Sequence, residues 1–239
     1  MTTATESVGL ALALIAHLDH DLIDIVALSL RVTLTAVLLS SLLGLPLGAL
    51  LGLARFPGRQ ALIVVSNTLM GLPPVVVGLT VYLLVSRAGP FGWLALLYSP
   101  GAMIMAQVVL VTPIVIALSR QVIESLAEEY GEQLRSLGAT TPVLVATLIR
   151  EGRGGLLTAV LAGFARASAE VGAVMIVGGN IDHHTRVMTT TIALEVNKGD
   201  LPLALALGLV LLLIALMVNA AVSVAVLRGQ RHDSAVARP

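Results

Sequence analysis

The chain has 239 residues, of which 57% are hydrophobic and 12% are charged, against about 25% charged residues in a typical soluble domain. This composition excludes an ordinary water-soluble fold. The 14 basic and 14 acidic residues cancel, so no net charge is available to attract nucleic acid or an anionic membrane surface. The absence of cysteine excludes disulfides, thiol catalysis and cysteine-ligated metals, and none of the five histidines has the HExxH spacing of a metal site.

The first 24 residues contain a short apolar run from Val8 to Leu18. A run of about 11 residues is too short to cross a bilayer and is typical of an interfacial helix. Because it lacks a basic flank and begins after Glu6, it does not resemble a cleaved signal peptide. We therefore expect residues 1–24 to form an N-terminal interfacial segment.

Five longer apolar blocks follow, and each can form a helix that crosses a hydrocarbon core about 30 Å thick. They run from Val32 to Leu53, Leu62 to Val85, Gly101 to Leu118, Leu156 to Val177, and Leu203 to Leu227. The sequence therefore predicts an all-α membrane protein, with about five transmembrane helices in one domain that spans residues 1–239.

The basic residues predict the orientation of these helices, because cytoplasmic loops carry the positive excess. If the loop between the first two spans is cytoplasmic, only Arg87, Arg186 and Lys198 fall on the outer side. Nine then fall on the cytoplasmic side: Arg55, Arg59, Arg120, Arg135, Arg150, Arg153, Arg228, Arg231 and Arg238. We expect the N-terminus outside and the C-terminus in the cytoplasm.

Glycines and prolines within the first two spans predict how the helices are shaped and packed. Gly44, Gly48 and Gly52 recur every four residues, and such a ridge lets another helix approach closely in lipid. Pro73 and Pro74 remove backbone donors, so they must break or kink the second span. Either the break only shapes the bundle, or its irregular backbone lines a water-filled path.

The fourth span contains a pair of charged residues, Arg166 and Glu170, at i and i+4 on one predicted helix face. A central Arg costs about 2.5 to 3.5 kcal/mol to insert, and such residues usually face the bundle interior, pair, and mark a pathway. The pair is thus either an internal ion pair that fixes helix packing, or part of an anion path or its gate. Gly178, Gly179 and Asn180 then predict the end of the helix, because glycine adopts the left-handed conformation of a C-cap.

The longest polar stretch covers residues 119–155 on the predicted cytoplasmic side. It predicts a first helix from about Gln121 to Leu137 that Gly138 stops, and a second from Thr141 to about Arg150. A helical hairpin that an otherwise buried protein presents to the cytoplasm is either a docking surface for a partner or an ordered linker.

The hairpin sequence EQLRSLGA resembles the EAA loop of binding-protein-dependent ABC importer permeases, although Gln133 and Leu134 replace the usual two alanines. In that family the loop docks into a groove of the cytoplasmic ATPase, so the resemblance favours the docking alternative. The residues that it marks for coupling are Glu132, Arg135, Leu137, Gly138 and Ala139.

The resemblance extends from about Leu28 to the end of the chain and includes SLRVTLTAVLLSSLLGLPLGALLGLARFPGR, MGLPPVVVGL and AEVGAVMIVGGNIDHHTRVMTTTIALEVNKGD. These stretches are similar to oxyanion permeases, and more to the tungstate than to the molybdate type, which tends to carry a GEFGA sequence. The resemblance implies a type I importer permease in a prokaryotic inner membrane. It also implies a homodimer, two ATPase subunits and one external oxyanion-binding protein.

An energy source is required, because moving a dianion inward against an inside-negative potential of 100 mV costs about 5 kcal/mol. The chain has no GxxxxGK[ST] motif, so we expect ATP and magnesium on the partner ATPase and no catalytic residue or cofactor here. The alternatives are a molybdate permease of the same class and a secondary anion transporter, although no second copy of the Pro-Pro segment or of the charged pair is present. An intramembrane enzyme is disfavoured, because Ser168 and Glu170 face different sides of a helix. His183 and His184 are expected to be solvated loop residues, and the pore-lining faces stay open.

Overall fold

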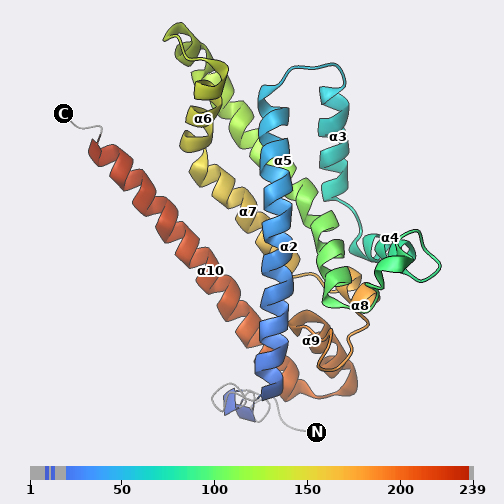
Figure 1. Ribbon diagram of the computed structural model, residues 1–239. Coiled ribbons are helices and arrows are strands. Elements are labelled where there is room, and N and C mark those ends of the chain that lie inside the picture. The colour runs from blue at the N-terminus through green and yellow to red at the C-terminus, as the bar shows by residue number, and fades with distance from the viewer. Residues whose placement is uncertain (1–8, 11, 14–19, 237–239) are drawn as a thin grey trace.

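The computed structural model describes residues 9–10, 12–13 and 20–236, with side chains through Val222 and at Val224. This part of the chain consists of helices joined by loops and contains no strand (Figure 1). In chain order its elements are α2 (His20–Leu53), α3 (Arg59–Met70), α4 (Pro74–Val85), the short 3₁₀ helix η1 (Gly92–Leu94), α5 (Pro100–Ser136), α6 (Thr141–Glu151), α7 (Arg153–Ser168), α8 (Gly172–Gly178), α9 (Met188–Lys198) and α10 (Leu201–Val236).

Three of the described helices, α2, α5 and α10, are long and apolar enough to cross a bilayer. Two bent pairs also qualify as broken spans: α3 with α4, bent by 102°, and α7 with α8, bent by 59°. The prediction of about five spans is therefore confirmed as three continuous helices and up to two broken ones. Most of the Val8–Leu18 run lies outside the described residues, and residues 20–24 belong to α2 rather than to a separate segment.

The helix α5 occupies the centre of the bundle and packs against α2, α3, α4, α6, α7 and α8 (Figure 1). Its close contact with α2 runs along the glycine ridge, as the sequence predicts. A Cβ atom added at Gly48 would lie 1.9 Å from Ser119 Oγ and 2.7 Å from the carbonyl oxygen of Ile116. No side chain larger than hydrogen fits there without separating the two helices.

The first helix of the predicted cytoplasmic hairpin is not a separate element, and this expectation was wrong. The third span continues as one helix, α5, from Pro100 to Ser136, so the hairpin is built on its end. After Leu118 the residues change from apolar to polar, and the helix continues through this change without a break. The helix ends where the sequence places a stop, because Gly138 has φ +81°.

The last helix, α10, packs on the bundle along its first half, where Ile214 and Val218 also contact the core of α2, α5 and α7. Ala206 and Leu207 are fully buried against α2 and α9, whereas Leu212 and Leu216 are 69% and 66% exposed. In Figure 1 the C-terminal half of α10 diverges from the other helices. An apolar helix face of this kind is suited to lipid or to another apolar chain rather than to water.

Candidate functional site

The charged pair of the fourth span lies at a helix break. Arg166 Nη1 and Glu170 Oε2 are 2.6 Å apart, so the two residues form an ion pair. However, α7 ends at Ser168, and Glu170 is in the link before α8 rather than on the same helix. The expectation of one unbroken helix was therefore wrong. Glu170 is 3% exposed and the Arg166 side chain 28%, so the carboxylate is buried while the guanidinium reaches the edge of the fold.

The break is stabilised by hydrogen bonds that an unbroken helix would not need. The second carboxylate oxygen of Glu170 accepts a hydrogen bond from the Ala173 amide at 2.9 Å, which satisfies one of the free donors that begin α8. The Ala167 carbonyl accepts from Gln107 Nε2 at 3.1 Å, and the Glu170 carbonyl accepts from Thr189 Oγ1 at 2.8 Å. Side chains from α5 and α9 thus replace the bonds that the helix lost.

Gln107 and Thr189 are site residues that the sequence analysis missed. The available signal for Gln107 was its amide in the middle of an apolar span, where polar groups usually have a structural or functional role. Thr189 belongs to a run of three threonines, which by itself does not indicate a partner.

The second broken span meets the first one. As the sequence predicts, Pro73 and Pro74 interrupt the helix, because α4 begins at Pro74, whose missing amide would be unpaired in the first turn anyway. A Cβ atom added at Gly78 of α4 would lie 2.7 Å from Cα of Ala173 in α8, so the two half-helices are in close contact. The irregular backbone of both spans is therefore gathered in one region of the fold (Figure 1).

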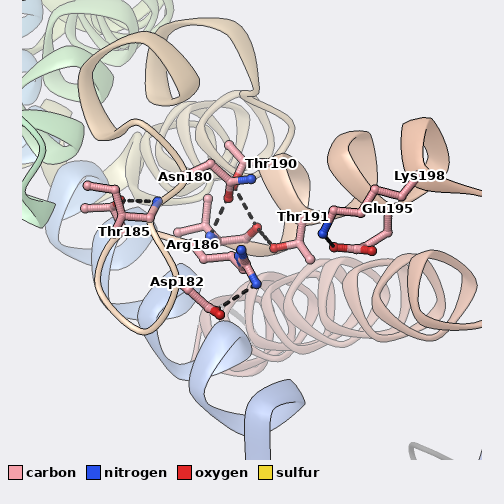
Figure 2. Close-up of polar contacts among 10 residues, drawn as sticks. Asn180, Asp182, Thr185, Arg186, Thr190, Thr191, Glu195 and Lys198 are labelled. Carbon is pink, nitrogen blue, oxygen red and sulfur yellow. Dashed lines mark hydrogen bonds and ion pairs between the residues drawn. The ribbon is translucent and has the colours of Figure 1, made fainter. Parts of the chain in front are cut away.

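The residues Gly178, Gly179 and Asn180 end α8, as the sequence predicts. Gly179 has φ +72°, and an added Cβ would lie 2.9 Å from the Tyr98 ring, so glycine is required for conformation and for space. Asn180 has a further role, because its Oδ1 accepts a hydrogen bond from Thr190 Oγ1 at 2.8 Å (Figure 2). The end of α8 is thereby attached to α9.

Figure 2 also shows the polar contacts of the loop from Ile181 to α9. Arg186 pairs with Asp182 at 2.7 Å, and Lys198 pairs with the buried Glu195 at 2.8 Å. His183 and His184 are exposed in this loop. They line a groove of about 500 Å³, together with Asp21, Asp24, Arg31 and Arg186.

The predicted coupling residues lie at the tip of the α5–α6 hairpin. Leu137 is 84% exposed, which is unusual for a leucine outside lipid and is typical of an interaction surface. Glu132, Arg135 and Gly138 are exposed beside it, and Ala139 is half-buried. The second hairpin helix begins at Thr141 with Pro142 in its first turn, as predicted.

The base of the hairpin is tied to the rest of the bundle by charges. Glu124 of α5 forms ion pairs with Arg59 of α3 and with Arg120 one turn before it. Arg59 Nε also donates to the Leu51 carbonyl at the end of α2, at 2.7 Å. These contacts thereby join α2, α3 and α5 at the base of the hairpin.

Comparisons with known proteins identify this architecture. A family model described as "Binding-protein-dependent transport system inner membrane component" matches residues 44–228. A probable anion ABC transporter permease of Haloferax volcanii is 41% identical over 204 residues, which are 83% of this chain and 88% of that protein. The tungstate uptake system permease protein TupB of Peptoclostridium acidaminophilum is 40% identical over 222 residues, 93% of this chain and 97% of its own.

A more distant relative is the sulfate transport system permease protein CysT of Escherichia coli, 31% identical over 79% of this chain and 72% of that protein. The relatives and the family model cover both broken spans and the hairpin. The chain belongs to the inner membrane components of binding-protein-dependent ABC transport systems.

Proposed function

We propose that the chain is the transmembrane subunit of an ATP-driven importer for tungstate. The observation that carries the proposal is the 40% identity over 93% of the chain to the tungstate uptake permease of Peptoclostridium acidaminophilum. The tungstate uptake permease of Campylobacter jejuni is 39% identical over 87% of the chain, whereas the sulfate permease of Escherichia coli is 31% identical over 79%. The alternative is molybdate, a tetrahedral dianion of nearly equal size.

The proposed assembly contains two copies of this chain, two cytoplasmic ATPase subunits that bind ATP and magnesium, and an external oxyanion-binding protein. The hairpin faces the cytoplasm in this arrangement, and the loop around His183 and His184 faces the binding protein. The distribution of basic residues supports this orientation, because Arg55, Arg59 and Arg135 lie at the hairpin end. The membrane is the inner membrane of a prokaryote.

Movement of the ATPase pair reaches the membrane through α5 in this proposal. The helix has 37 residues and is therefore about 55 Å long, and it carries both the hairpin and the contacts to α7 and α8. Because α5 is continuous from the hairpin to these contacts, with one helical hydrogen bond lost at Pro113, closure of the ATPase pair moves α5 and changes the packing of the two broken spans.

Arg166 is the proposed attractive charge for the dianion. The Arg166 side chain is partly exposed while its partner Glu170 is buried. An anion can therefore approach Arg166 without competing with a carboxylate on the exposed side. The ion pair fixes the arginine between passages, and the positive potential lowers the barrier for the anion.

The test of the substrate is ATP hydrolysis by the complete complex in lipid, with tungstate, molybdate, sulfate or no anion on the binding protein. We expect tungstate to stimulate hydrolysis at the lowest concentration. An equal or better response to molybdate would keep the transporter class and refute the choice of anion.

The role of Arg166 is tested by Arg166→Gln, with Arg87→Gln as the control because Arg87 is an exposed arginine of the α4–η1 turn. We expect the first variant to assemble and to lose most tungstate uptake, and the second to transport normally. Unchanged uptake by an assembled Arg166→Gln complex would refute the role of Arg166 in the anion path.

The coupling surface is tested by Gly138→Asp, with Gly58→Asp as the matched control. Both glycines have positive φ, +81° and +91°, and an added Cβ would meet nothing within 4 Å at either, but Gly58 lies in the α2–α3 turn. We expect only Gly138→Asp to abolish ATPase docking or to uncouple hydrolysis from the binding protein. Normal uptake by this variant would refute the coupling role of the hairpin.

A further inference from the structure

A small cavity of about 20 Å³, partly open to the surface of the chain, lies beside the α7–α8 break. A buried water needs a space of about 10–15 Å³ on this measure and two to four polar partners, so the cavity has room for a single water molecule. Its lining comes from α2, α5, α7, α9, α10 and the break itself, and the polar members are Ser29, Thr33, Gln107, Ser168, Glu170 and Thr189.

Gln107 is the polar residue of this cavity that lacks a partner for one of its atoms. The residue is 3% exposed, and its Nε2 donates to the Ala167 carbonyl. Its Oε1 is buried and has no hydrogen-bond partner among the described residues. Turning the amide over would place Oε1 against the Ala167 carbonyl oxygen, so the orientation is fixed and the unpaired atom is an acceptor.

The other polar groups around the cavity include donors that a water molecule could accept from. Ser29 Oγ already donates its single proton to the Ile25 carbonyl and accepts from the Met188 amide, so it cannot donate to a water. The hydroxyls of Thr33 and Ser168 can donate to a water oxygen, and a carboxylate has more lone pairs than the two that Glu170 uses. A water that donates to Gln107 Oε1 and accepts from a hydroxyl satisfies the site.

We infer that this cavity binds one ordered water molecule, and that Gln107 and this water are positioning groups for the α7–α8 break. Gln107 is on the same continuous helix as the coupling hairpin, and it bonds the carbonyl three residues before Glu170. A tilt of α5 therefore shifts the backbone that presents the Arg166–Glu170 pair. The water keeps the polar groups paired while the angle of the break changes. The transport consequence rests on the proposed function, but the water site does not.

The water site is tested by determining the structure of the complete complex, wild type and Gln107→Met, at a resolution that shows ordered water. Methionine keeps the length of the side chain and removes both hydrogen-bonding groups. We expect a water about 2.7–3.2 Å from Gln107 Oε1 in the wild type and none at this place in the variant. A dry wild-type cavity, or a protein donor on Oε1, would overturn the inference.

The positioning role is tested by anion-stimulated ATP hydrolysis of the same two complexes, with Asn219→Leu as the control. Asn219 is exposed on α10 and its amide donates only within its own helix, to the Ala215 carbonyl at 2.8 Å. For Gln107→Met we expect a roughly tenfold lower maximal stimulated rate at an unchanged half-saturating concentration of loaded binding protein, the size of effect that losing one buried hydrogen-bonded group gives.

Three outcomes separate the possible failures. A variant that only folds poorly shows low assembly and a rate per assembled complex that is unchanged, which would refute the positioning role. A shift in half-saturation with an unchanged maximal rate would place Gln107 in anion binding instead and also refute it. If the wild-type complex gives no response to any oxyanion, the proposed function fails, while the structural test of the water site still decides its own question.

Discussion

Glu170 combines two roles that are usually separate in a membrane helix. Its carboxylate pairs with Arg166 and also caps the first turn of α8 through the Ala173 amide. No proline is present in this break, and a helix-compatible sequence runs through it. Glu170 is only 3% exposed, and the free-energy cost of burying its carboxylate is offset because both of its oxygens are paired.

A comparison of Arg166→Gln with the double variant Arg166→Gln/Glu170→Gln tests this interpretation at the residue scale. Arg166→Gln leaves the buried carboxylate without its cation, and breaking one side of a buried pair typically costs about 3–5 kcal/mol. Because Arg166 is partly exposed, we expect the lower end of that range or less. Adding Glu170→Gln removes the uncompensated charge and keeps an oxygen for the Ala173 amide, so the double variant is more stable than Arg166→Gln alone.

The measurement is thermal unfolding of the purified complexes in detergent or lipid. A double variant that is less stable than Arg166→Gln would mean that the carboxylate charge itself, rather than its pairing with Arg166, holds the break together.

At the scale of elements, the bundle depends on how closely α2 approaches α5. The ridge of Gly44, Gly48 and Gly52 lets Val115, Ser119 and Arg120 of α5 lie against the α2 backbone. Close backbone approach of this kind is a main source of helix association in lipid, where there is little hydrophobic drive between helices. The charges that tie Glu124 to Arg59 then act at the end of an interface that is already tight.

Gly48→Ala tests this interface, with Gly208→Ala in α10 as the matched control. The new methyl group at Gly48 would lie 1.9 Å from Ser119 Oγ, whereas nothing lies within 4 Å at Gly208. We expect Gly48→Ala to destabilise the protein by about 1–3 kcal/mol through overpacking. Alanine at Gly208 is expected to be neutral or stabilising by up to about 1 kcal/mol.

Thermal unfolding and the yield of assembled complex are the readouts for both alanine variants. Equal stability of the two would show that α2 and α5 separate at little cost, contrary to the packing of the ridge.

At the scale of the whole molecule, the long axis of α5 separates two functional ends. The α5–α6 hairpin with its exposed Leu137 lies at one end, and η1 lies near the start of α5 at the other (Figure 1). The two broken spans lie between these ends and contact α5. In the proposed mechanism this arrangement lets one continuous helix connect the ATPase-docking surface to the irregular backbone of the broken spans.

The orientation can be measured directly because the chain has no cysteine, so a single introduced cysteine is the sole site for a maleimide. Trp93 is 79% exposed and Leu137 is 84% exposed, and they lie at opposite ends. We expect an impermeant maleimide to label Trp93→Cys in intact spheroplasts and Leu137→Cys only in inside-out vesicles. Bound ATPase should protect Leu137→Cys from labelling and leave Trp93→Cys reactive. Labelling of the two positions from the opposite sides would refute the predicted orientation.

The sequence determined the features that depend on local chemistry. Apolar blocks of sufficient length predicted the spans, Pro73 and Pro74 predicted one break, and Gly138 and Gly179 predicted two helix ends that both have positive φ. The glycine ridge predicted that another helix packs closely on α2, but it did not indicate that this helix is α5. These features could be predicted because each arises from the size, the ring or the conformational freedom of residues that are neighbours in the chain.

Only the tertiary structure decided that α5 continues into the hairpin and that the fourth span breaks before Glu170. At the break the Ala167 carbonyl accepts from the Glu170 amide and from Gln107, 60 residues away, and the Glu170 carbonyl accepts from Thr189. In the hydrocarbon core a backbone group that leaves its helix must find its partner within the fold, because the lipid offers none. Whether a span can break therefore depends on which side chains the rest of the fold brings to that point, and the local sequence does not contain this information.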